Sequence, residues 1–325
     1  MRTNPFRKIY DACNEGDSKQ KFENLPPFPR LIDIEATNAC NFRCLMCPTG
    51  NRSMKRKTGM MSQETFDKIL DECAKWNCAI RWVQWGENDM HSDLFAHIRA
   101  AHDRGVLTHL NTNGSKLTPE RIRELIDTGL DSIKFSFQGV DQQSYKEMRN
   151  TDFFEELIEV ISNFHAARGD SPVPYIQLST TITYEDEETV AEFRRRTEPI
   201  ADLVSIGRTV FDNLDLSAVR LKPEEIERLH KLKSQESVIK VHPECPEVFD
   251  KMSIFWDGAV SACCADADKK MPIGDVNKNT MEEIWNSDAM NHYRAMLADM
   301  RHDELELCSN CYDYQSLSKA GLQGL

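Results

Sequence analysis

The sequence predicts an α/β fold, a partial (β/α)6 barrel of the TIM type followed by a small C-terminal appendage. From residue 31 onward, short runs of β-forming residues alternate with helical patterns, which is typical of a sheet of parallel strands. After about residue 235 this alternation stops. The 325 residues, 40% of them hydrophobic, suffice for one large and one small domain. We expect an N-terminal extension over 1–30, the barrel over 31–235 and the appendage over 236–325.

The six expected strands are rich in β-branched and aromatic residues, and lie at 31–37, 80–85, 107–112, 132–137, 175–183 and 203–210. Helices are expected between them, among others at 62–76, 118–129 and 188–200. The second of these has Thr118 as its N-cap, Pro119 at its first position and Gly129 as a stop. Right-handed crossovers curl such a sheet toward a barrel, which six units leave open. A flat, doubly wound sheet is the alternative.

The appendage has its own signals. Residues 252–264 predict a hairpin with its turn at Asp257 and Gly258. Residues 279–300 predict one helix, which Thr280 and Glu283 begin as a capping box.

Composition excludes several classes of function. The formal net charge is −13 and the isoelectric point is about 5.2, so nucleic acid and anionic membrane are not expected as partners. No run of 18 apolar residues predicts a transmembrane helix, and the first residues lack the apolar core of a signal peptide. We therefore expect a cytoplasmic protein. In that compartment disulfides are disfavoured, so most of the eleven cysteines are candidate metal ligands or catalytic groups. Cys73, within a helix pattern, is expected to be buried packing.

The first cysteine group is a C-x3-C-x2-C run, Cys40, Cys44 and Cys47. It follows the first expected strand, at the end where parallel barrels carry their active sites. Three thiolates can hold three irons of a [4Fe–4S] cube and leave the fourth iron open for chemistry. A zinc knuckle with a distant fourth ligand is the alternative, although zinc sites more often pair their ligands as C-x2-C.

This run resembles the cluster-binding motif of the radical SAM superfamily, in which S-adenosylmethionine chelates the fourth iron. The stretch "VQWGEND" after the second strand is similar to that family's GGEP-type segment. The resemblance implies that Gln84, Gly86 and Glu87 meet the methionine amino group. Trp85 and Asn88 replace the family's first glycine and its proline.

Two further stretches extend the resemblance along the chain. "LNTNG" resembles the family's TNG turn, which implies that Asn113 binds the cofactor. "SFQGVDQQSYKEMR" is similar to a stretch whose counterparts of Ser136 and Arg149 lie near the methionine carboxylate. A guanidinium suits a carboxylate because it can bind it bidentately. The alternative for Arg149 is a solvated helix end. Gln138 replaces the family's aspartate.

The second cysteine group has the spacing C-x12-G-x4-C followed by C-x2-C. This pattern resembles the SPASM and twitch appendages of radical SAM enzymes, in its shorter, one-cluster form. The implied metal ligands are Cys245, Cys263, Cys308 and Cys311. A structural four-cysteine zinc site is the alternative. Either Cys263 or its neighbour Cys264 could be the ligand, and the spacing C-x12-G-x4-C favours Cys263. Cys264 is then either a packed thiol or a hydrogen-atom donor.

The resemblance implies two [4Fe–4S] clusters, S-adenosylmethionine, and an external electron donor such as a flavodoxin or ferredoxin. By likeness to the aminocyclitol and sugar dehydrogenases of the twitch subgroup, the expected reaction oxidises a small polar alcohol to a ketone. Arg208 and Cys264 are the candidate catalytic residues. An epimerase, a dehydratase and a peptide-modifying maturase are the alternatives. We expect no leader-binding domain, because the first strand begins near residue 31. An electron carrier would need neither barrel nor cofactor motifs.

Overall fold

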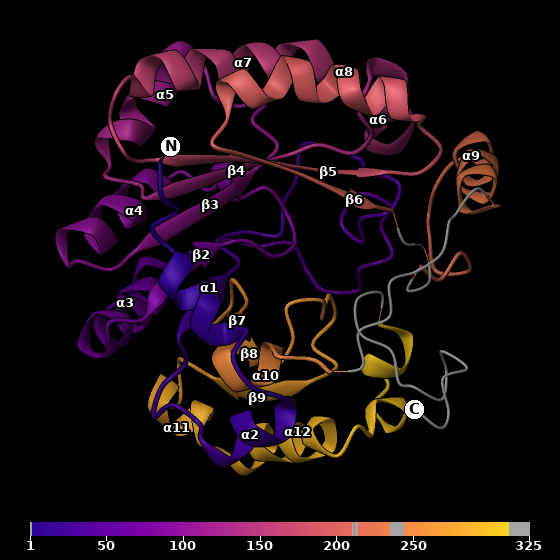
Figure 1. Cartoon of the computed structure of the whole chain (residues 1–325). Coiled ribbons are helices and arrows are strands. Elements are labelled where there is room, and N and C mark those ends of the chain that lie inside the picture. The colour runs from indigo at the N-terminus through magenta and orange to yellow at the C-terminus, as the bar shows by residue number, and fades with distance from the viewer. Residues whose placement is uncertain (1, 210, 212–213, 235–243, 312–325) are drawn as a thin grey trace.

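A computed structural model describes residues 2–209, 211, 214–234 and 244–311. One mixed sheet runs through it in the order β6-β5-β4-β3-β2-β1-β7-β8-β9 (Figure 1). The strands are β1 Leu31–Ile34, β2 Ala79–Trp82, β3 Thr108–Thr112, β4 Ser132–Ser136, β5 Tyr175–Ile182, β6 Leu203–Arg208, β7 Lys251–Ile254, β8 Ala259–Ser261 and β9 Pro272–Asp275.

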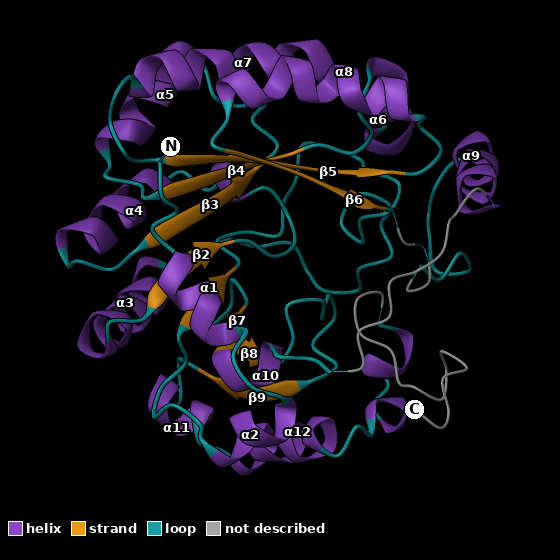
Figure 2. Cartoon of the chain, viewed as in Figure 1, coloured by secondary structure: helices purple, strands orange, loops and turns teal. Residues whose placement is uncertain are grey.

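The first six strands are all parallel, and each pairs with the next along the chain. Their order never reverses, which rules out the doubly wound alternative. Helices lie on the outer side of the curved sheet (Figure 2). The predicted partial barrel of the TIM type is therefore confirmed.

The α-helices are α1 Arg7–Cys13, α2 Ser18–Glu23, α3 Gln63–Trp76, α4 Leu94–Asp103, α5 Pro119–Asp127, α6 Gln142–Arg149, α7 Phe154–Arg168, α8 Glu187–Thr197, α9 Pro223–Ser234, α10 Glu247–Asp250, α11 Met281–Trp285 and α12 Asp288–Ala298. Short 3-10 turns are η1 Asn88–Met90, η2 Glu198–Ile200, η3 His302–Glu304 and η4 Cys308–Asn310. Thr118 caps α5 as predicted, by accepting from the backbone N–H of Arg121. No helix in the described part of the chain combines the length and the apolar character needed to span a membrane.

The two faces of the barrel sheet differ in chemistry. Alternate strand residues, such as Ile32, Trp82 and Phe135, belong to the buried core that the helices cover. The positions between them form the inner face, defined by Asp33, Arg81, His109 and Lys134. Arg81 binds Asp33 bidentately at 2.7 and 2.8 Å. The inside of the barrel is thus polar and charged.

The appendage continues the barrel sheet. β7 pairs in parallel with β1, with Asp33 opposite Ser253, and β8 then pairs antiparallel with β7. The predicted hairpin is therefore confirmed, with Gly258 at a φ of 86° in its turn. The prediction of one helix over 279–300 was wrong. The chain forms α11 and α12 because Ser287 turns extended and caps α12, accepting from the N–H of Met290.

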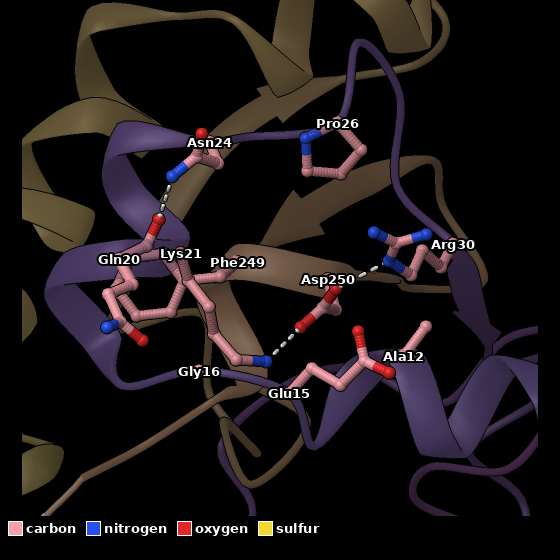
Figure 3. A pocket seen from close by; sticks show the side chains of 10 residues that line it. All are labelled: Ala12, Glu15, Gly16, Gln20, Lys21, Asn24, Pro26, Arg30, Phe249 and Asp250. Carbon is pink, nitrogen blue, oxygen red and sulfur yellow. Dashed lines mark hydrogen bonds and ion pairs between the residues drawn. The ribbon is translucent and has the colours of Figure 1, made fainter.

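The N-terminal extension ties barrel and appendage together. Phe6, at the start of α1, is fully buried against Leu31, where β1 begins. Figure 3 shows a small pocket in which Asp250, at the end of α10, lies between Lys21 and Arg30. Its carboxylate accepts from Lys21 at 2.7 Å and from Arg30 at 3.0 Å. Because these charges are already paired, the pocket serves as a joint between segments.

Candidate active site

The three-cysteine loop begins just after β1 and is wound tightly. The N–H of Cys47 donates to the carbonyl of Cys44 at 3.3 Å, and the N–H of Asn51 donates to the carbonyl of Cys47 at 2.8 Å. A Cβ at Gly50 would lie 2.3 Å from the carbonyl oxygen of Cys44, so only glycine fits there. The loop therefore holds its thiols at the carboxyl end of β1, as expected.

The surroundings of these thiols suit a metal cluster. Cys44 is buried, and Cys40 and Cys47 are half-buried. Burial raises the pKa of Cys40 to about 12, and Glu87, Cys44 and Cys47 add to this rise. Burial and the neighbouring Cys44 also raise the pKa of Cys47. Three thiolates are therefore costly there unless a cation compensates them, which the irons of a cluster would do. The donor set fits a [4Fe–4S] cluster, and the assignment of these ligands stays a prediction.

Arg149 lies against this loop. Its guanidinium donates to Sγ of Cys44 at 3.6 Å and to the backbone carbonyl of Ser136, at the end of β4. It is buried, and its Nε has no partner among the described residues. Arg149 is therefore not a solvated helix end. A buried guanidinium beside the cysteines leaves a donor for an anionic ligand, which agrees with the predicted carboxylate contact without testing it.

The segment after β2 packs onto the start of the cysteine loop. The N–H of Glu87 donates to the carbonyl of Ala39 at 2.7 Å, and a Cβ at Gly86 would lie 2.4 Å from the carbonyl oxygen of Thr37. Gln84 has a φ of 95°, which ends β2 at Trp82, earlier than the predicted residue 85. Both amide atoms of Gln84 are buried without a partner in the described chain. Such groups cost free energy until a ligand or water satisfies them.

Glu87 joins this segment to the TNG turn after β3. Its carboxylate accepts from the hydroxyl of Thr112 at 2.9 Å and from the N–H of Asn113 at 2.7 Å. Burial raises the pKa of Glu87 to about 7. The side chain of Asn113 donates to Asn41, within the cysteine loop, at 3.0 Å. Thr112 belongs to the TNG turn and Asn41 to the cysteine run, but the sequence analysis gave neither a role, because their partners Glu87 and Asn113 lie in other segments.

The second cysteine group is assembled from distant parts of the chain. Cys245 precedes α10, Cys263 follows β8, Cys308 begins η4 and Cys311 follows η4. Burial raises the pKa of Cys245 well above its usual range, and the thiols of Cys308 and Cys311 add to this rise. The pKa of Cys263 is likewise raised by burial and by Cys245 and Cys308. The structure thus brings the four predicted ligands together, and their coordination of a metal stays a prediction.

Two family profiles match the parts of the chain that carry the two cysteine groups. The profile of the radical SAM superfamily matches residues 34–197, and that of an iron-sulfur cluster-binding domain named SPASM matches residues 245–312. The chain belongs to the radical SAM superfamily. It is a radical SAM enzyme that uses S-adenosylmethionine and [4Fe–4S] clusters.

The curated relatives of this radical SAM enzyme have varied chemistry. An AdoMet-dependent heme synthase of Methanosarcina barkeri is 28% identical over 50% of this chain and 46% of its own. A PqqA peptide cyclase of Ruegeria pomeroyi is 33% identical over 36% of this chain and 31% of its own. The chain thus spans less than half the length of either. A tungsten-containing aldehyde ferredoxin oxidoreductase cofactor-modifying protein of Pyrococcus furiosus is 23% identical over 86% of this chain and 87% of its own.

Solved structures share the fold. BtrN in complex with AdoMet and 2-DOIA has 17% identity and a TM-score of 0.57, over 88% of this chain and 94% of BtrN. SuiB of Streptococcus suis bound to its precursor peptide SuiA has 14% identity and a TM-score of 0.65, over 89% of this chain and 72% of SuiB. At these identities the likeness establishes the fold alone.

The two candidate catalytic residues of this radical SAM enzyme occupy different settings. The Sγ of Cys264 and carboxylate oxygens of Asp33 and Glu247 lie within 4.8 Å of one another. Cys264 is therefore placed between the second cysteine group and the inner face. A hydrogen bond with Cys263, together with burial, raises the pKa of Cys264 well above its usual range. Arg208 is exposed at the end of the edge strand β6. Both roles stay predictions.

The carboxylates beside Cys264 do not form an additional metal site. Arg81 neutralises Asp33, and Lys251 donates to Glu247 at 2.5 Å. A metal ion would have to displace both cations.

One segment joins the two cysteine regions. Arg56, downstream of the three-cysteine loop, binds the carboxylate of Glu35 at 2.8 and 2.7 Å. Its Nε also donates to the carbonyl of Ala267, in the loop after Cys264, at 2.5 Å. The neighbouring N–H of Lys55 donates to Asp268 at 2.8 Å. The loop of the first group is thus fastened to the loop of the second.

Proposed function

We propose that this radical SAM enzyme removes a hydrogen atom from an alcohol carbon of a sugar- or aminocyclitol-like substrate and oxidises it to a ketone. The observation that carries the proposal is the second group of four cysteines next to the inner face. Four ligands would close a cluster completely, which suits an electron acceptor rather than a substrate-binding metal. The structure of BtrN was solved in complex with AdoMet and 2-DOIA, and its fold matches this one over most of both chains, which further supports the proposal.

The cofactors would be held by the residues described above. Cys40, Cys44 and Cys47 would bind the first cluster; Gln84, Gly86, Glu87, Asn113, Ser136 and Arg149 would contact S-adenosylmethionine; and Cys245, Cys263, Cys308 and Cys311 would bind the second cluster. When bound, these groups supply a carbon-centred radical that takes a hydrogen atom, and an acceptor for the remaining electron. The protein's part is to position the substrate, exclude water and receive the hydroxyl proton.

The inner face supports a small polar substrate. Asp33 and Arg81 are paired, His109 bonds to Asn111 at 2.8 Å, and no described carboxylate forms an ion pair with Lys134. Burial and the nearby Arg81 lower the pKa of Lys134. A surface lined with amine, guanidinium and amide groups binds a ligand rich in hydroxyl groups better than it binds an apolar ligand. Lys134 is also a candidate to receive the hydroxyl proton, a role that the sequence had left unassigned.

Epimerisation is the second candidate function, and the position of Cys264 favours it. A thiol at the inner face could return a hydrogen atom to the substrate carbon, which would give an isomer instead of a ketone. Dehydration, and peptide modification as in the PqqA cyclase, are further alternatives for the same chemistry.

Anaerobic turnover with a pool of candidate sugars and aminocyclitols, S-adenosylmethionine and a reductant tests the proposal. Mass spectrometry should find one member lighter by two hydrogens, about 2 Da. An isomeric product that carries solvent deuterium, with no ketone formed, would replace the dehydrogenase proposal with the epimerase.

A further inference from the structure

The segment around the first cysteine group has a charge opposite to that of the whole chain. Between Glu35 and Glu64 the sequence holds five basic residues and no acidic one, although the chain carries a net charge of −13. Three of the five, Arg43, Arg52 and Lys57, are exposed and form no ion pair with any described residue. These three residues are called the basic patch below.

The other two basic residues have partners or neighbours of opposite charge. Arg56 is bound to Glu35. Lys55 lies near Asp215 and Glu306, and its N–H bonds to Asp268. Of these five basic residues, only the three of the basic patch therefore present positive charge that no described residue pairs with.

The basic patch borders a surface pocket that reaches the first cysteine group. Arg43 and Arg52 line a surface pocket together with Cys40, which is half-buried. Lys57 is fixed at the same place, because Asn38, another lining residue, donates to its carbonyl at 2.9 Å. Asn38 also accepts from the N–H of Gly59 at 3.0 Å. The side chain of Asn38 thus ties the backbone at Lys57 to the start of the cysteine loop, and the patch borders a predicted iron ligand, Cys40.

We propose that the basic patch docks a small acidic one-electron carrier protein of the flavodoxin or ferredoxin type. Each turnover consumes one electron at the first cluster, and a soluble carrier has to approach that cluster closely to deliver it. Transient redox complexes use small interfaces, so they depend on complementary charge for orientation and rate. A local positive patch on an otherwise acidic protein would steer an acidic carrier to this point and repel it elsewhere. The carrier loses one electron and the first cluster gains it.

The proposal needs a reductant but does not depend on which substrate is oxidised. Formation of 5′-deoxyadenosine is therefore the readout, because it reports reductive cleavage of S-adenosylmethionine without a known substrate. The test compares the holoenzyme with the triple variant Arg43→Glu, Arg52→Glu and Lys57→Glu. The control variant carries Lys19→Glu, Arg99→Glu and Arg123→Glu, which reverse the charge of three exposed side chains on other elements. It therefore changes the net charge of the protein by the same amount.

With a reduced flavodoxin as donor at low ionic strength, the patch variant should lose at least about tenfold in rate, and the control should stay close to the unmodified enzyme. With dithionite all three should react alike. Binding gives a second readout. The Kd of flavodoxin for the unmodified holoenzyme should rise steeply as salt is raised to about 0.5 M, because mobile ions screen exposed charges. The Kd for the patch variant should be high at both salt concentrations.

Equal flavodoxin-driven rates and Kd values in the patch variant and the control would overturn the proposal. A patch variant that also loses its dithionite-driven rate would overturn it too, since its residues would then act within the active site. The single variant Lys57→Glu tests whether the effect of the triple variant comes from loss of the first cluster, because Lys57 is the patch residue farthest along the chain from the cysteines. It should lower the flavodoxin-driven rate alone and keep the iron content.

Discussion

The first cysteine group lies within residues 40–47 and offers three thiols beside a buried arginine, whereas the four predicted ligands of the second come from residues 245–311. The first group is built by one tight loop, so its geometry is local. The second exists only because β7, β8 and the end of the described chain meet. The two groups therefore suit different roles. An incomplete ligand set leaves a metal open to a cosubstrate, and a complete one leaves it only electrons to exchange.

Removing the first group should have the largest effect. The triple variant Cys40→Ala, Cys44→Ala and Cys47→Ala should lose all cleavage of S-adenosylmethionine, and its iron content should fall from about eight to about four per chain. Iron analysis and product chromatography measure both. Cys73→Ala, a buried thiol of α3, is the control and should keep its iron. Tightly bound zinc and about four irons in the unmodified protein would argue for a zinc site in the second group.

Removing half of the second group should separate two activities. Cys308→Ala with Cys311→Ala should abolish substrate oxidation, because the remaining electron has no acceptor, but slow cleavage of S-adenosylmethionine should persist. Both products can be followed in one anaerobic assay.

Cys264→Ala is the matched control for this experiment. It should keep most of the oxidation, because a thiol outside the ligand set is packing in a dehydrogenase. Loss of turnover in Cys264→Ala would favour the epimerase.

The buried ion pair of Arg56 and Glu35, in the segment that joins the two cysteine regions, should contribute to stability. Arg56→Met leaves the buried Glu35 without its partner, which should lower the free energy of unfolding by about 3–5 kcal/mol. Chemical denaturation of the anaerobic protein measures this. The exposed pair of Lys75 and Glu282 also links barrel to appendage, but Lys75→Met should cost less than about 1 kcal/mol. Similar losses in both variants would show that burial of the Arg56 pair is irrelevant.

The contacts around the open side of the first group should set cofactor affinity. Arg149→Ala and Glu87→Ala should each weaken binding of S-adenosylmethionine by about tenfold to hundredfold, because each removes a charge-assisted contact worth about 1.5–3 kcal/mol. Equilibrium dialysis with both clusters intact is the measurement. Unchanged affinity in both variants would refute the role that the family resemblance gives to these residues.

The smallest effect concerns pH. Burial raises the pKa of Glu87 to about 7, so its carboxyl is neutral below that pH and ionised above it. Only the ionised form can accept hydrogen bonds from the amino group of S-adenosylmethionine with both carboxylate oxygens. Affinity should therefore rise with pH through about 7, by at most about tenfold per pH unit. Glu87→Gln should remove this dependence, and a profile that is identical in the variant would exclude Glu87 as its cause.

The sequence by itself determined the local features. Strand and helix periods, the cap at Thr118 and the capping box at Thr280 depend on residues a few positions apart, as does the spacing of Cys40, Cys44 and Cys47. The barrel and the first cysteine loop could therefore be predicted. The break at Ser287 could not, because an amphipathic pattern continues across it and only packing selects the cap.

Tertiary structure decided everything that depends on pairs distant in the chain. It placed β7 against β1, so that the appendage extends the barrel sheet. It put Cys264 beside Asp33, and it gave Glu87 the N–H of Asn113 as a partner. The physical reason is that tertiary contacts form between side chains at irregular separations along the chain, and no periodic sequence pattern marks such pairs. A linear pattern records which groups exist, and only the folded sheet fixes which of them meet.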